Sequence, residues 1–142
     1  MNIRHEIPDA PTYLSLRSAA GLTRSDEASA EIALRHSLFS VVARDELGEC
    51  IGMARVIGDG GLHWQVVDLV VLPARQDQGI EALLLAEVAD FLNRAATREA
   101  DVTVMASLSA LPLYQQAGFK LVYPDRYGMS LVTASAEEEQ RR

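Results

Sequence analysis

The segment that most constrains the fold is a strand, a tight loop and a helix in succession over residues 66–95. The strand is β-branched and almost wholly apolar, and it ends at Pro73. After the loop, apolar residues recur at the spacing of an amphipathic helix, namely Ile80, Leu83, Leu84, Val88, Phe91, Leu92 and Ala95. A strand that is apolar on both faces belongs inside a covered sheet. The segment therefore predicts an α/β domain.

Further strands and helices are predicted on both sides of this segment. The expected strands are 3–7, 38–44, 50–58, 62–72, 101–106, 119–123 and 127–133, and the expected helices are 13–20, 25–35, 80–96 and 110–117. The strand–helix–strand crossover from 62–72 to 101–106 makes those two strands parallel, whereas 38–44 and 50–58 form a hairpin. The order predicts a mixed, mostly antiparallel sheet of six to seven strands with helices on both faces.

Composition limits the class of protein. The 142 residues fit one domain, expected over residues 1–134, followed by an acidic tail at 135–142. The net charge of −7 argues against general nucleic-acid binding, which depends on clustered Lys and Arg. There is one cysteine, Cys50, and no apolar run of membrane-spanning length or secretory type. A cytoplasmic protein without a membrane partner is expected.

The loop between strand and helix has the chemistry of a phosphate site. The start of a helix presents free backbone N–H groups and the positive end of the helix dipole. Gly79 lies at that point, and Arg75 offers a charge-assisted contact to the same anion. Taken alone the signal is weak, because many strand–helix turns contain one glycine and hold no ligand.

Two motifs resemble those of the GCN5-related N-acetyltransferase (GNAT) family. Residues 70–84 (VVLPARQDQGIEALL) are similar to its acetyl-CoA motif, and residues 113–119 (LYQQAGF) to its Tyr-x-x-x-Gly-Phe element. Residues 52–61 (GMARVIGDGG), followed by WQVVD, are similar to one bacterial branch of the family. The resemblance implies a GNAT fold and transfer of an acetyl group from acetyl-CoA to a primary amine of unknown identity.

The resemblance also implies roles for particular residues. The strand residues Leu69, Val70, Val71 and Leu72 would contact acetyl-CoA through their backbone. The loop contacts would come from Arg75, Gln76, Asp77, Gln78, Gly79, Ile80 and Glu81. Tyr114 aligns with the family's general acid. A phenol suits that role because it holds its proton at neutral pH and can give it to the departing thiolate. Its alternative role is packing against the long helix.

Asp77 and Glu81 depart from the family pattern, which commonly has glycine or alanine at these two positions. A carboxylate at residue 81 near a pyrophosphate is repulsive. It also stabilises the first turn of a helix when it points away from the loop. Two functions therefore stay open: an acetyltransferase, and a non-catalytic GNAT-fold protein whose acetyl-CoA binding is weakened or lost.

The remaining candidates concern the base and the acceptor. Asp68 is a lone carboxylate in an apolar strand, where it is either the general base or the partner of an arginine such as Arg55. His63 is a second candidate base. Arg55 and Trp64, with Tyr13 and Arg17, are candidates for lining the acceptor pocket. The histidines lack metal-ligand spacing, and strand edges near the C-terminus are compatible with a homodimer.

Overall fold

The structure is a computed structural model that describes residues 1–134. Its strands are β1 (Asn2–Arg4), β2 (Phe39–Arg44), β3 (Cys50–Gly58), β4 (His63–Val71) and β5 (Asp101–Val104). Its α-helices are α1 (Ala10–Ala19), α2 (Glu27–Arg35), α3 (Ile80–Ala95) and α4 (Leu111–Gln116), and short 3₁₀ turns span Pro73–Arg75 and Leu108–Ala110. The expected α/β fold is confirmed.

The strands form one sheet in chain order, β1-β2-β3-β4-β5. The pairs β1–β2, β2–β3 and β3–β4 are antiparallel, and short turns connect β2 to β3 and β3 to β4. Helix α3 carries the chain back across the sheet, so β5 pairs with β4 in parallel. The crossover predicted from the sequence is thereby confirmed.

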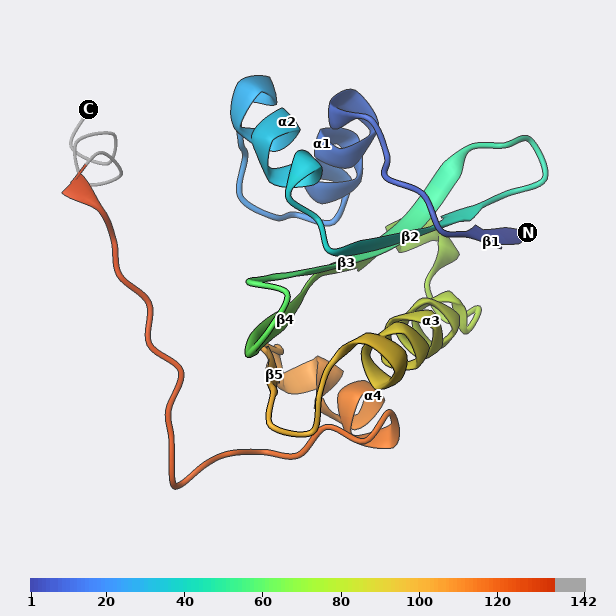
Figure 1. Ribbon diagram of the computed structural model, residues 1–142. Coiled ribbons are helices and arrows are strands. Elements are labelled where there is room, and N and C mark those ends of the chain that lie inside the picture. The colour runs from blue at the N-terminus through green and yellow to red at the C-terminus, as the bar shows by residue number, and fades with distance from the viewer. Residues whose placement is uncertain (135–142) are drawn as a thin grey trace.

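The helices cover both faces of the sheet (Figure 1), with α1 and α2 on one face and α3 and α4 on the other. Each face has its own apolar core. On the α3 face, Leu84, Leu85 and Val88 pack with alternate residues of the central strands. On the α1 face, Tyr13, Leu16 and Leu34 pack with the opposite set, which includes Val42 and Met53. This division follows from the two-residue period of a strand.

The parallel pair β4–β5 is short. Its last paired residues are Val66 and Val104, whereas β4 continues to Val71. Directly after the last pair, β4 departs from regular geometry: Asp68 has φ of 57°, and the register with β3 shifts between Met53 and Arg55. Such a bulge bends a strand and redirects its side chains. It occurs where β4 stops pairing with β5.

Two predicted strands are not formed. Residues 119–123 and 127–133 lie outside the sheet, so the part of the chain that the structure describes has five strands and not six to seven. Both segments have strand-forming composition, but a strand also requires a partner edge, which local sequence does not reveal. After α4 the chain runs below the domain and leaves it as an extended arm (Figure 1). The predicted acidic tail at 135–142 lies outside the described residues.

No helix within residues 1–134 combines the length and the apolar character that crossing a bilayer requires.

Two neighbouring leucines of α3 test the assignment of the helix face. Leu84 is fully buried, whereas Leu83 is 46% exposed. We expect Leu84→Ala to lower the free energy of unfolding by about 2–5 kcal/mol, since it removes buried methyl groups and leaves a cavity. The matched Leu83→Ala variant should change it by less than about 1 kcal/mol. Urea denaturation of both variants measures the difference, and equal losses would contradict this packing.

Candidate active site

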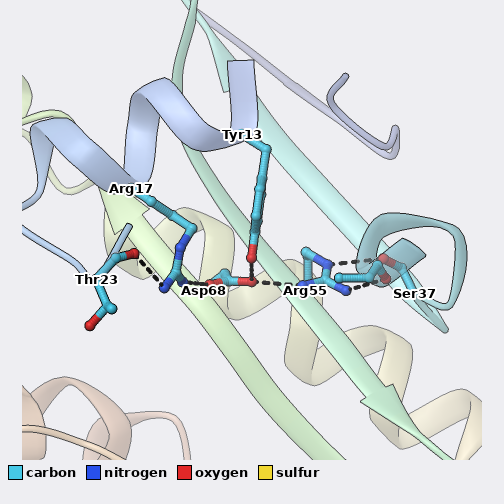
Figure 2. Close-up of polar contacts among 7 residues, drawn as sticks. Tyr13, Arg17, Thr23, Ser37, Arg55 and Asp68 are labelled. Carbon is cyan, nitrogen blue, oxygen red and sulfur yellow. Dashed lines mark hydrogen bonds and ion pairs between the residues drawn. The ribbon is translucent and has the colours of Figure 1, made fainter. Parts of the chain in front are cut away.

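A buried carboxylate, Asp68, joins three elements at the bulge of β4 (Figure 2). Its Oδ2 accepts hydrogen bonds from Tyr13 Oη and from Arg55 Nη1, both at 2.7 Å. Its Oδ1 accepts one from Arg17 Nη1 at 2.5 Å. The Asp68 side chain is only 6% exposed. Two guanidinium groups and a phenol therefore hold one carboxylate at the sheet face under α1.

Local geometry explains how these groups meet. Tyr13 and Arg17 are four residues apart on α1, so their side chains lie on the same helix face. The bulge turns Asp68 toward that face, away from the α3 core that Val66 enters. Arg55 comes from the neighbouring strand β3. The guanidinium carbons of both arginines lie within 6 Å of the Tyr13 ring centroid, at 5.7 and 5.6 Å.

Each nitrogen of the Arg55 guanidinium donates a hydrogen bond within the protein. Besides Asp68, it donates from Nε to Ser37 Oγ at 2.9 Å and from Nη2 to the Ala33 carbonyl at 2.7 Å. It therefore ties α2 and the following turn to β4. The pairing of Asp68 with Arg55, one of the two roles predicted for the carboxylate, is confirmed. The prediction that Arg55 lines an acceptor pocket gains no support, because its side chain is buried and satisfied.

These contacts also affect the titration of Tyr13. Burial raises the pKa of the phenol above its usual value, and the hydrogen bond to Asp68 raises it further. Tyr13 is consequently a proton donor to Asp68 at neutral pH. With all three donors in place, the Asp68 oxygens are engaged, which argues against a free general base at this position.

Trp64 lies in the α3 core and not in a pocket for an acceptor. Its ring packs at 6.0 Å from the Phe91 ring, and its Nε1 donates to the Gly61 carbonyl at 2.9 Å. The predicted acceptor role gains no support from this burial. His63 is exposed at the start of β4, in a turn that the Asp59 carboxylate closes.

The loop before α3 leaves the start of the helix without a side-chain cap. Gly79 begins the helix with φ of 77°. Asp77 also has a positive φ, at 68°. A cavity of about 200 Å³ opens at this point, bounded by the end of β4, the loop and Leu113. The loop residues that line it are Arg75, Gln76, Asp77, Gly79, Ile80, Glu81 and Ala82.

Three charged residues are among those that line the cavity. Arg75 donates from its guanidinium to Asp45 at 3.3 Å, in a partly exposed pair. Glu81 and Asp77 are the two acidic residues among them. The lining thus combines an uncapped helix start with one basic and two acidic residues.

Tyr114 of α4 lies on the opposite side of the same region. It is buried, its ring packs against Phe119, and no hydrogen bond to its hydroxyl is recorded within residues 1–134. Burial raises the pKa of the phenol, and the negative charge of Glu81 raises it further. Glu81 is therefore near enough to influence both the anion site and this phenol.

The end of β4, beyond Val66, lies beside the cavity at the loop before α3. Val70 and Val71 are buried, Val71 reaches the cavity, and Leu72 N donates to the Ile51 carbonyl at 2.9 Å. Leu69 and Leu72 pack as partly buried residues at the edge of the core. Gln78 is exposed in the loop and is not among the residues that line the cavity.

Sequence reasoning proposed Tyr13 and Arg17 for an acceptor pocket and missed that both contact Asp68. The available signal was their four-residue spacing on one helix. Ser37, which holds Arg55, gave no signal at all, because it lies in an irregular segment. Within residues 1–134 no group of three or more His, Cys, Asp or Glu side chains is placed to hold a metal ion.

Comparisons with known proteins fit this geometry. Residues 13–132 match the family model described as an acetyltransferase (GNAT) domain. A comparison with curated proteins finds no match.

Solved structures give a consistent picture. SA2161 from meticillin-resistant Staphylococcus aureus is a protein of unknown function described as a probable acetyltransferase. It is 32% identical to this chain with a TM-score of 0.87, and the match covers 93% of this chain and 98% of SA2161. SP0256 from Streptococcus pneumoniae, a GNAT-family acetyltransferase, is 28% identical with a TM-score of 0.76, covering 94% and 98%. YhbS from Escherichia coli, a GNAT-family N-acetyltransferase in complex with CoA, is 27% identical with a TM-score of 0.64, covering 84% and 68%.

Removing the Asp68 charge tests the cluster. We expect Asp68→Asn to lower the free energy of unfolding by about 3–5 kcal/mol, because it leaves two largely buried guanidinium groups without a counter-charge. The control is Asp90→Asn, which breaks an exposed pair with Arg94 and should cost less than about 1 kcal/mol. Chemical denaturation compares the two. A loss no larger than that of the control would show that Asp68 does not hold these elements together.

Proposed function

The chain belongs to the GNAT acetyltransferase family, and from that premise we propose that it transfers an acetyl group from acetyl-CoA to a primary amine. One observation carries the proposal: the backbone of β4 runs on past its last pair with β5, between an uncapped helix start and a buried tyrosine. These are the groups that binding of a pyrophosphate, a pantetheine chain and a thioester requires. The CoA complex of YhbS supports the same ligand class.

The loop and the first turn of α3 would bind the pyrophosphate. Backbone N–H groups there have no side-chain cap, and the helix dipole favours an anion. The left-handed conformation of Gly79 turns the chain into the helix. Arg75 would add a charge-assisted contact from the cavity wall. Gln76, Asp77 and Ile80 also line the cavity.

The backbone of residues 69–72 would hold the pantetheine and polarise the thioester carbonyl. Main-chain amides suit this task because they are fixed before the substrate arrives, and they act on the negative charge that develops on the oxygen. Side-chain identity matters little for such contacts, which is consistent with a strand of plain Leu and Val residues.

The chemical step would proceed by direct attack of the neutral amine on the thioester carbon. The new bond is C–N, the C–S bond breaks, and the departing sulfur takes a proton from Tyr114. The proton that the amine nitrogen loses would pass to solvent, and solvent would reprotonate the tyrosinate. The raised pKa of Tyr114 ensures that the phenol carries this proton at neutral pH. Asp68, whose oxygens are held by three donors, acts in this proposal by fixing the bulge of β4 and not by taking the proton of the amine.

A second candidate is a GNAT-fold protein that binds a ligand without catalysis. It is favoured by Glu81, an acidic residue among those that line the cavity where the pyrophosphate would lie. Repulsion between unit charges a few ångströms apart is about 1 kcal/mol at high dielectric and more where water is excluded. The two candidates differ in whether wild-type protein binds acetyl-CoA.

Calorimetry with acetyl-CoA separates them. We expect wild-type protein to bind, and Glu81→Gln to bind about 5-fold or more tightly, since about 1 kcal/mol of repulsion is removed. The control is Glu99→Gln, an equal change of charge at an exposed position beyond the other end of α3, which should leave affinity unchanged. Binding by Glu81→Gln alone would favour the non-catalytic candidate. No binding by either protein would overturn the assignment of acetyl-CoA.

Tyr114→Phe tests the acid. We expect kcat to fall by about 100-fold or more with the acetyl-CoA dissociation constant within about twofold of wild type, because only the transferable proton is removed. Turnover is followed as release of CoA with a panel of primary amines. Tyr123→Phe, which removes a hydroxyl at an exposed position, is the control. An unchanged kcat would remove Tyr114 from the mechanism.

A further inference from the structure

The guanidinium of Arg17 is held less completely than that of Arg55, although both contact Asp68 (Figure 2). Every guanidinium nitrogen of Arg55 donates a hydrogen bond, at distances between 2.7 and 2.9 Å. Arg17 makes one short contact, from Nη1 to Asp68, and one long contact, from Nη2 to the Thr23 carbonyl at 3.4 Å. Its Nε is buried and has no hydrogen-bond partner within residues 1–134. Arg17 therefore has donor capacity that the described residues do not use.

The unused donors of Arg17 lie together on one edge of the guanidinium. Nε and Nη2 donate in the same direction from the planar group, and such an edge binds a carboxylate through two parallel hydrogen bonds. The Arg17 side chain is 20% exposed, against 4% for Arg55, so it borders solvent. Residues 20–26, which connect α1 to α2 and include Thr23, are all exposed. The long contact with the Thr23 carbonyl is the one that a carboxylate would replace.

The charges around Asp68 do not balance. Within residues 1–134 the ion pairs of Arg17 and Arg55 are both with Asp68, so two guanidinium groups share one carboxylate. A positive excess that is largely removed from water favours an anion beside it. The chain as a whole carries a net charge of −7, so this local excess is not part of a generally positive surface. The imbalance indicates a small anionic group as the missing partner.

Arg17 also lies next to the proposed site of acetyl transfer. Asp68 directly precedes residues 69–72, whose backbone would hold the thioester. Arg17 Nη1 is 2.5 Å from Asp68 Oδ1. A carboxylate bound by Arg17 would therefore lie on the α1 side of this end of β4, within the length of a small molecule from the reacting carbon.

From these observations we propose that Arg17 binds the carboxylate of the acceptor, and that the amine acetylated by this protein belongs to a small amino acid. The inference rests on the proposed acetyl transfer and adds the class of acceptor to it. A free amino acid carries its amine close to a carboxylate, whereas a lysine side chain within a protein does not. A site that donates hydrogen bonds to one group of its substrate discriminates against an analogue without that group, because its own polar groups are left unpaired.

Matched pairs of acceptors test the preference for a carboxylate. Glycine is compared with glycinamide, and β-alanine with its amide, at equal concentrations of neutral amine and with saturating acetyl-CoA. We expect kcat/KM for CoA release to be about 10-fold or more higher for the carboxylate of each pair, mainly through KM, because the amide loses a charge-assisted contact. Equal values, or a preference for the amide, would overturn the inference and leave acetyl transfer in place. No CoA release with any amine would overturn the proposed function, and the inference with it.

Variants of Arg17 connect the preference to this side chain. In Arg17→Gln, whose fold is checked by its far-UV spectrum, we expect kcat/KM to fall by about 10-fold or more for glycine and to stay within about twofold for glycinamide. Arg17→Lys keeps the charge that Asp68 requires but lacks the two-donor edge, so it should show a smaller loss that is again confined to glycine. It carries the test if Arg17→Gln does not fold. The control Arg94→Gln, at an exposed position of α3, should retain the preference. An equal loss for both substrates would mean that Arg17 only positions Asp68, and would overturn the proposal.

Discussion

The arrangement of the candidate site depends on one buried ionic contact, the Asp68 carboxylate held by Arg17, Arg55 and Tyr13. A charged group of this kind is costly to remove from water, and it is tolerated here because each oxygen accepts a hydrogen bond from a cationic donor. The contact fixes α1 and, through Arg55, the end of α2 against β4. It does so two residues beyond Val66, the last residue of β4 that pairs with β5, and at the position with the left-handed backbone. The ionic cluster therefore lies next to the point where the two strands stop pairing.

Glu81 has opposing effects on the proposed chemistry. In the proposed complex its negative charge would oppose the pyrophosphate that the helix amides and Arg75 would bind. The same charge raises the pKa of Tyr114, which burial has already raised. A higher pKa keeps the phenol protonated, but it also makes proton transfer from the phenol to the departing thiolate less favourable. A catalyst with this residue gains a reliable proton donor at some loss of driving force and of cofactor affinity.

Sequence alone anticipated those parts of the molecule that local pattern determines. The amphipathic period of α3, the loop glycine at its start and the β3–β4 hairpin are local features, and the parallel β4–β5 pair follows from the crossover rule. The cluster around Asp68 was predictable only in part. Arg55 lies on the adjacent strand and was named, whereas Tyr13 and Arg17 come from more than fifty residues away, and their contact depends on how α1 packs. The positive φ of Asp68 could not be predicted from the amino-acid composition of its strand.

The two strands predicted after α4 fail for a different reason. Residues 119–123 and 127–133 have the side chains of strands, but strand formation is a property of a pair and not of a segment. The structure leaves both segments outside the sheet although β5 is its last strand, so strand-forming side chains were a necessary condition for a strand here and not a sufficient one.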